Sequence, residues 1–63
     1  MYTIQTIFND GLCKSEKTND LRQAIGAFQI YMLDTEVEYS CIVKNINHEY
    51  NVIATYDIRR ADI

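Results

Sequence analysis

The sequence contains no proline and no tryptophan, and it has only two glycines and two cysteines among its 63 residues. Two cysteines are too few for a disulfide scaffold, in which several bridges replace a hydrophobic core. Two glycines, one in a turn signal and one in a helical pattern, leave no glycine-rich loop to hold a phosphate group. No apolar stretch approaches the roughly 18 residues of a membrane span. We therefore expect no cofactor and no membrane partner.

The chain is short, mildly acidic and rich in apolar residues. Its hydrophobic fraction is 48% and its formal net charge is −3, a balance that argues against disorder. The length fits a single domain, residues 1–63. The start of the chain has neither the basic nor the apolar region of a signal peptide, so we expect a cytoplasmic protein. A chain of this length and start is typical of small bacterial, phage or plasmid reading frames.

A domain of this length has a weak core. It buries only about 60% of the surface that its unfolded chain exposes, and such domains often depend on a metal, a disulfide or oligomerisation. The sequence has no metal-binding motif, and its two cysteines fall in different predicted elements. We therefore expect oligomerisation to supply additional stability.

The first third of the chain predicts a strand and a turn. Residues 2–8 are dominated by β-branched and aromatic types, which favour a β-strand. In the following Asn9-Asp10-Gly11, Gly11 can adopt a positive φ at no steric cost. Residues 12–17 are mostly polar and predict either a short edge strand or a loop. The inner face of the first strand is expected to carry Tyr2, Ile4, Thr6 and Phe8.

The segment that follows predicts one helix. Thr18-Asn19-Asp20 supplies residue types that cap helix N-termini, and apolar residues then recur at spacings of four, three and four. The polar Asp34-Thr35-Glu36 ends the pattern. Gly26 inside the helix costs about 1 kcal/mol relative to alanine, and the sequence alone does not decide whether it serves a close contact. The predicted buried stripe is Leu21, Ile25, Phe28 and Met32, flanked by Ala24, Ala27 and Tyr31.

Residues 37–44 and 50–58 alternate apolar and polar side chains, which predicts a β-hairpin. The inward side chains are odd-numbered in the first strand and even-numbered in the second, so paired positions must add up to an odd number. A tight turn at Asn47-His48 satisfies this condition, because asparagine tolerates the left-handed conformation. The predicted pairs are Val43 with Val52, Cys41 with Ala54, Tyr39 with Tyr56, and Val37 with Ile58.

The resulting fold class is α+β, with the element order β-β-α-β-β. A single helix packs on one face of a small antiparallel sheet of three or four strands, so the other face stays uncovered. The predicted register places Ile42 opposite Ile53 on that uncovered face, and Ile7 lies on the corresponding face of the first strand. A contiguous cluster of branched apolar side chains suggests a covered surface. We expect a homodimer or another protein there; the alternative is a small apolar patch left in water.

The same register places Glu38 beside Asp57 and Glu36 beside Arg59. Two facing carboxylates can form an acid/base pair or a site for a hard metal ion. Arg59 would neutralise the cluster, however, and the chain supplies no third or fourth ligand. We therefore expect ion-paired surface residues at these positions, and no metal site.

Asp34, Glu36 and Glu38 also predict a row of acidic side chains. Alternate strand residues recur every ~6.6 Å, a spacing comparable to that of phosphates along a nucleic-acid strand. A phage-type or mobile-element inhibitor that mimics nucleic acid through an acidic rim would use such a row, and this is the alternative function. Binding to nucleic acid itself is not expected, because the basic residues are scattered and the pI is about 4.8.

No arrangement of residues in the sequence predicts catalysis. We expect Cys13 to point outward, Cys41 to lie in the core as a small hydrophobic residue, and His48 to occupy a hairpin tip without a catalytic partner. Nucleophile elbows, paired CxxC motifs and metal-binding helices are absent from the sequence. We predict a non-enzymatic protein-interaction domain that self-associates through the sheet face not covered by the helix.

Overall fold

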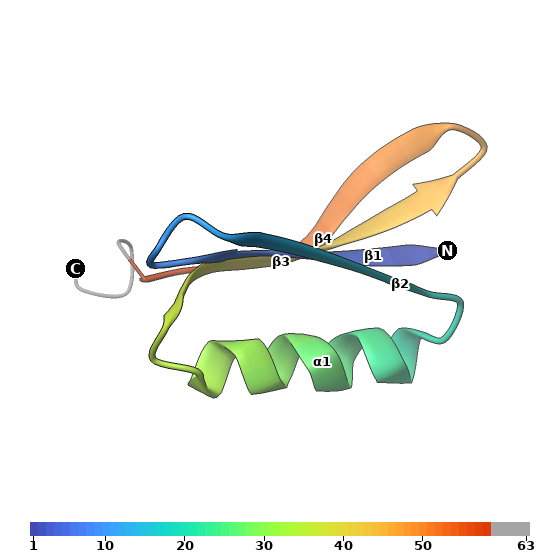
Figure 1. Ribbon diagram of the computed structural model, residues 1–63. Helices are drawn as coiled ribbons and strands as arrows, with labels where there is room; N and C mark the ends of the chain where they lie inside the picture. The colour runs from blue at the N-terminus through green and yellow to red at the C-terminus, as the bar shows by residue number, and fades with distance from the viewer. Residues whose placement is uncertain (59–63) are drawn as a thin grey trace.

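The computed structural model describes residues 1–58 and contains one helix packed against a four-stranded antiparallel sheet (Figure 1). The strand order in the sheet is β2-β1-β3-β4, and every neighbouring pair is antiparallel. The α+β class and the predicted element order are confirmed, and the polar segment left open between strand and loop is an edge strand. The elements are β1 (Tyr2–Phe8), β2 (Cys13–Thr18), α1 (Leu21–Leu33), β3 (Val37–Ile46) and β4 (Glu49–Asp57).

The turn between β1 and β2 forms as its sequence predicts. Gly11 has a φ of 89°, the left-handed region that favours glycine. The Leu12 N–H donates to the Asp10 carboxylate at 3.0 Å, which is the Asx turn expected of this residue type. The Phe8 N–H donates to the Leu12 carbonyl at 2.8 Å and closes the hairpin.

Helix α1 begins at a capped terminus but is rotated from the orientation that the sequence predicts. Asp20 is the N-cap, and its carboxylate accepts the Arg22 N–H at 2.9 Å. The buried helix residues are Ala24, Phe28 and Tyr31, so of the predicted stripe only Phe28 lies in the core. Ala24, the smallest of the three, is completely buried. The other three stripe residues lie on the flank of the buried face and are exposed: Leu21, Ile25 and Met32.

The predicted alternation in β3 is wrong, because β3 carries a bulge near its start. Tyr39 pairs with Ile7, but Phe8 pairs with Val37, so Glu38 is an extra residue in the ladder. After this extra residue the even-numbered side chains face the helix. Ile42, expected on the uncovered face, is only 1% exposed and lies in the core cluster opposite Ile4.

The β3–β4 hairpin follows the predicted register only near its tip. Asn47 and His48 have φ values of 51° and 66°, which give the two-residue turn expected there, and Val43 pairs with Val52. Beyond Val52 the register shifts by one, because Ile53 is an extra residue in β4. The predicted pairs of Cys41 with Ala54 and Tyr39 with Tyr56 are therefore wrong, and the observed partners are Ile42 with Ala54, Cys41 with Thr55 and Tyr39 with Asp57.

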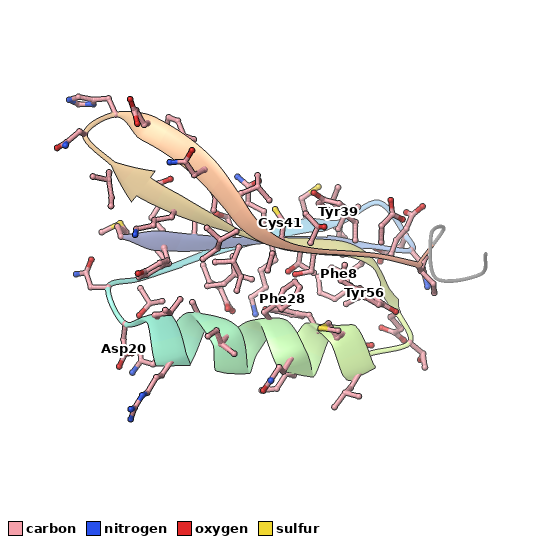
Figure 2. The ribbon with its side chains drawn as sticks, turned by 180° about the vertical axis from the view of Figure 1, so that it is seen from behind. Phe8, Asp20, Phe28, Tyr39, Cys41 and Tyr56 are labelled. Carbon is pink, nitrogen blue, oxygen red and sulfur yellow. The ribbon has the colours of Figure 1, made fainter. Side chains whose placement is uncertain are left out.

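The two sheet faces have different environments. Phe8, Phe28 and Tyr56 lie between the sheet and α1, whereas Tyr39 and Cys41 lie on the other side of the sheet (Figure 2). The hairpin tip rises away from the helix on that second side (Figure 1). Cys41 and Val43 are buried there although no helix covers them. The core between sheet and helix is made of Ile4, Ala24, Phe28, Tyr31, Val37 and Ile42.

Candidate interaction surface

The isoleucine cluster predicted on the uncovered sheet face does not form. Ile42 lies in the core under the helix, as described above. Ile7 and Ile53 are 37% and 47% exposed, but they belong to β1 and β4, and β3 lies between these two strands. The placement of Ile42 was wrong because the β3 bulge reverses the alternation on which the prediction depended.

The acidic residues are placed only partly as predicted. Glu38 and Asp57 line one surface hollow of about 330 Å³ together with Ile7 and Tyr39, so the two carboxylates share a site. In the ladder, however, Asp57 is opposite Tyr39, since Glu38 is the bulge residue. Arg59, the expected neutralising residue, lies outside the described residues.

The prediction of a regular row of acidic side chains along the strand is also wrong. β3 begins at Val37, so Asp34 and Glu36 precede the strand and do not follow its repeat. Asp34 caps the C-terminus of α1, where its carboxylate accepts the Glu36 N–H at 2.9 Å. Glu36 instead lines a surface hollow of about 430 Å³ next to Phe8 and Leu12. The strand repeat from which the phosphate-like spacing was predicted therefore does not include Asp34 and Glu36.

The side chains with reactive potential are separated from one another. Cys13 and Cys41 are both free thiols, exposed and buried respectively, but Cys41 is buried on the sheet face away from the helix and not in the predicted core beneath it. The Cys41 thiol lies 3.9 Å from the Gln5 amide oxygen, and His48 is at the hairpin tip. Within residues 1–58, no group of three or more His, Cys, Asp or Glu side chains could hold a metal ion.

An ionic cluster connects the helix to the edge strand β2. The Lys14 ammonium lies 3.0 Å from the Glu16 carboxylate and 5.9 Å from the centre of the Tyr31 ring, and the Tyr31 hydroxyl donates to Glu16 at 3.0 Å. The hydrogen bond from Lys14 lowers the pKa of Glu16 below its ordinary value, and the bond to Glu16 raises the pKa of Lys14. The cluster holds the Tyr31 side of α1 over β2.

The surface of α1 that faces away from the sheet combines polar side chains with two large exposed apolar ones. Arg22 is the only charged residue in the 13 residues of the helix. Ile30 is 69% exposed and Leu33 is 85% exposed, in addition to the three flanking stripe residues. We name Arg22, Gln23, Gly26, Gln29, Ile30 and Leu33 the outer helix face.

Sequence reasoning missed this surface, although a signal for it was available. The predicted stripe accounted for seven apolar or aromatic positions of the helix and left Ile30 and Leu33 without a place in the core. Apolar residues that remain after one helix face has been filled indicate a second contact surface.

Gly26 lies on the same outer face. A Cβ atom built at this position would meet no atom within 4 Å apart from the local backbone of the helix, so the fold of this chain gives no steric reason for a glycine here. Glycine nevertheless costs helix stability at an interior position. The space above Gly26 is therefore open.

Comparisons with known proteins do not add to this description. No family model, no curated protein and no solved structure matches the chain. No helix within residues 1–58 has the length and apolar character needed to cross a lipid bilayer.

Proposed function

We propose that this protein is a small non-enzymatic interaction domain that self-associates as a homodimer. The observation that carries the proposal is the distribution of apolar residues. Among residues 1–58, twelve large hydrophobic side chains are exposed, whereas eight hydrophobic residues are buried, and two of those are an alanine and a cysteine. Single exposed apolar residues are normal, but a small domain with more large ones outside than inside supports a covered surface.

Helix α1 is better suited to this association than the uncovered sheet face. Ile42 lies in the core and not on the uncovered sheet face, and the exposed Ile7 and Ile53 are separated by β3. The helix presents five exposed large apolar side chains on one element of 13 residues: Leu21, Ile25, Ile30, Met32 and Leu33. We therefore place the association surface on the helix.

A cytoplasmic location remains part of the proposal. Both cysteines are free thiols, and Cys13 is exposed. Exposed free thiols persist in reducing compartments, whereas oxidising ones favour disulfides. This chemistry supports the location without testing it.

Sedimentation equilibrium at micromolar concentration tests the proposal. We expect the wild-type protein to form dimers and Ile30→Glu to be monomeric, because the substitution places a charge at one of the most exposed apolar side chains of the helix. Ile7→Glu is the matched control, since it makes the same change at an exposed isoleucine of the uncovered sheet face. We expect Ile7→Glu to remain dimeric, and circular dichroism checks that both variants fold.

Three results separate the possible outcomes. A wild-type protein that stays monomeric up to about 500 μM, well above a micromolar dissociation constant, contradicts the proposal. Dimers that Ile7→Glu disrupts and Ile30→Glu spares move the surface back to the sheet. The variant that carries both Glu36→Lys and Glu38→Lys tests the acidic rim. Loss of binding to a nucleic-acid-binding protein in that variant alone would favour the nucleic-acid mimic.

A further inference from the structure

We propose that the outer edge of β4 pairs with the same edge of a second copy, in antiparallel orientation and around a twofold axis at the level of Ile53 and Ala54. This contact joins two four-stranded sheets into one sheet of eight strands. It is separate from the helix surface proposed above and goes beyond it. Three features of β4 carry the inference: an edge without charged protection, outward backbone groups with a symmetric spacing, and side chains that match in the resulting register.

The two edges of the sheet differ in how well they are protected against a further strand. β2 has six residues, of which three are charged, and its Lys14 contacts Glu16 and the Tyr31 ring of α1. β4 has nine residues, is rich in β-branched and aromatic types and contains neither lysine nor proline. Natural sheets use lysine, proline and short strands to prevent edge pairing. Of the two edges, β4 is therefore the one that is open to another strand.

Alternate residues of β4 direct their backbone groups away from β3. Asn45 uses its backbone groups on the β1 side, where its N–H donates to the Met1 carbonyl at 2.8 Å. In an antiparallel ladder, two residues that are directly opposite point these groups either both toward or both away from each other. Tyr50 is opposite Asn45, so its N–H and C=O point outward, and those of Val52 do the same two residues later.

The bulge in β4 makes the spacing of the outward residues symmetric. Beyond Ile53 the outward residues are Thr55 and Asp57, because their partners in β3 lie an even number of residues before Asn45. The four outward residues therefore follow one another at intervals of two, three and two, an order that is the same in both directions. A regular strand has intervals of two throughout and matches only one side of the bulge. A second copy of β4, running antiparallel, matches all four positions.

The side chains are compatible with this register. Tyr50 is opposite the partner's Asp57, and Val52 is opposite the partner's Thr55, a pair of β-branched side chains of the kind that stabilises neighbouring strands. Tyr50 and Val52 are 75% and 58% exposed in the single chain, so the contact removes apolar surface from water. Glu49 and Asp57, the two carboxylates of β4, are each opposite an uncharged residue, so like charges do not meet.

The shape of the strand agrees with the pairing. A bulge bends the strand that carries it, and Ile53 is the middle residue of β4. Two copies related by a twofold axis at this level therefore bend alike at the same place. Helix α1 packs mainly against β1, β2 and β3, on one side of the sheet, and leaves the outer edge of β4 open (Figure 1).

The contact is expected to be weaker than the helix contact. One pair of short strands is smaller than a standard interface, and we expect a dissociation constant in the millimolar range. Wild-type dimers should therefore combine into larger species only above about 1 mM. Ile30→Glu, in which the helix contact is removed, isolates the β4 contact at these concentrations.

Disulfide crosslinking tests the register and captures a weak contact. Chains with Cys13→Ser and Ile30→Glu that also carry either Val52→Cys or Thr55→Cys are mixed at about 1 mM and oxidised. We expect a covalent dimer only in the mixture, because Cα atoms of such opposite residues lie about 5.5 Å apart, within the range of a disulfide. Two copies of residue 52 would be about 10 Å apart along the strands, which a disulfide does not span.

Thr55→Pro tests the contribution of the backbone. The Thr55 N–H points outward, so proline removes a donor to the partner and leaves the β3–β4 ladder intact, as edge strands tolerate. In the Ile30→Glu chain, we expect Thr55→Pro to raise the dissociation constant at least tenfold, measured from the β4 amide NMR shifts between about 0.05 and about 2 mM. Thr55→Val is the matched control, because it keeps the N–H and should keep the contact. Circular dichroism checks the fold, and Val52→Lys, a charge at the same edge, replaces the proline variant if that variant unfolds.

The outcomes distinguish this inference from the proposed function. β4 amide shifts that do not change with concentration, shifts that Thr55→Pro leaves unaffected, or crosslinks that form in Val52→Cys alone overturn the β4 pairing. None of these results changes the expected difference between wild type and Ile30→Glu at micromolar concentration, which tests the helix surface. Conversely, a mixed crosslink in a protein whose wild type stays monomeric at micromolar concentration supports the β4 pairing and overturns the helix surface.

Discussion

Two hydroxyl groups are buried between the sheet and the helix, and they bond to each other. Thr6 on β1 and Ser40 on β3 are almost completely buried, and their side-chain oxygens lie 3.1 Å apart. Thr6 was expected on the inner face, but Ser40 was expected to point outward. A buried hydroxyl without a partner costs about 1–3 kcal/mol, so the pairing removes a penalty on both strands.

Breaking this pair on one side is expected to be more harmful than removing both hydroxyls. Thr6→Val and Ser40→Ala should each lower the free energy of unfolding by about 1–3 kcal/mol, because each leaves the other hydroxyl unsatisfied. The double variant should lose less than the sum of the two, with a coupling of about 0.5 kcal/mol or more. Urea unfolding of the four proteins measures this cycle, and strictly additive losses would show that the bond contributes nothing.

The Glu16 carboxylate gives the fold an acid-sensitive contact. Its pKa in the folded chain is lowered from the ordinary value of 4.5 by the Lys14 hydrogen bond, and the Tyr31 hydroxyl adds to this effect. A lowered folded pKa means that the stabilisation is complete above the unfolded value and is lost as the pH falls through the folded value.

Glu16→Gln should remove this pH dependence and keep an acceptor for Tyr31. We expect the stability difference between wild type and Glu16→Gln to shrink as the pH falls from about 6 to about 3. The effect is small because the Glu16 side chain is 37% exposed to solvent. A difference that stays constant over this range would show that the ion pair does not contribute.

At the scale of elements, the sequence predicts each strand and the helix but not which side chains of β3, β4 and α1 face the core. Composition, turn residues and the capping Asp20 identify the elements, because these signals are local. The bulges at Glu38 and Ile53 depend on contacts between strands, and a pattern read along one strand cannot show them. The helix rotation has a similar cause, since Tyr31 is drawn over β2 by its contacts with Glu16 and Lys14.

Deleting Ile53 tests the β4 bulge. If Ile53 is an extra residue, its removal leaves Val43 paired with Val52 and Ile42 with Ala54, as they are now. We expect the deletion variant to fold and to lose less than about 1.5 kcal/mol of stability. If Ile53 were part of a regular ladder, the deletion would turn Ala54 and Tyr56 outward and would cost about 3 kcal/mol or more. Urea unfolding distinguishes the two results.

At the scale of the whole molecule, the prediction of a partner came from chain length, and the structure changes where we place that partner. A short chain without a disulfide or a metal motif favours association whether the partner binds the sheet face or the helix. The surface depends on the strand register and on the helix rotation, and both of these are set by tertiary contacts. We therefore assign Ile42 to the core and no longer to the candidate interaction surface, and we assign Ile30 and Leu33 to that surface.

The central claim is that the exposed face of α1 binds a second copy of the chain. Sedimentation equilibrium of wild type, Ile30→Glu and Ile7→Glu, over a concentration series from about 1 to about 500 μM, tests it most directly. We predict a reversible dimer for wild type and Ile7→Glu and a monomer for Ile30→Glu at every concentration. A wild-type protein that remains monomeric throughout the series would contradict the account.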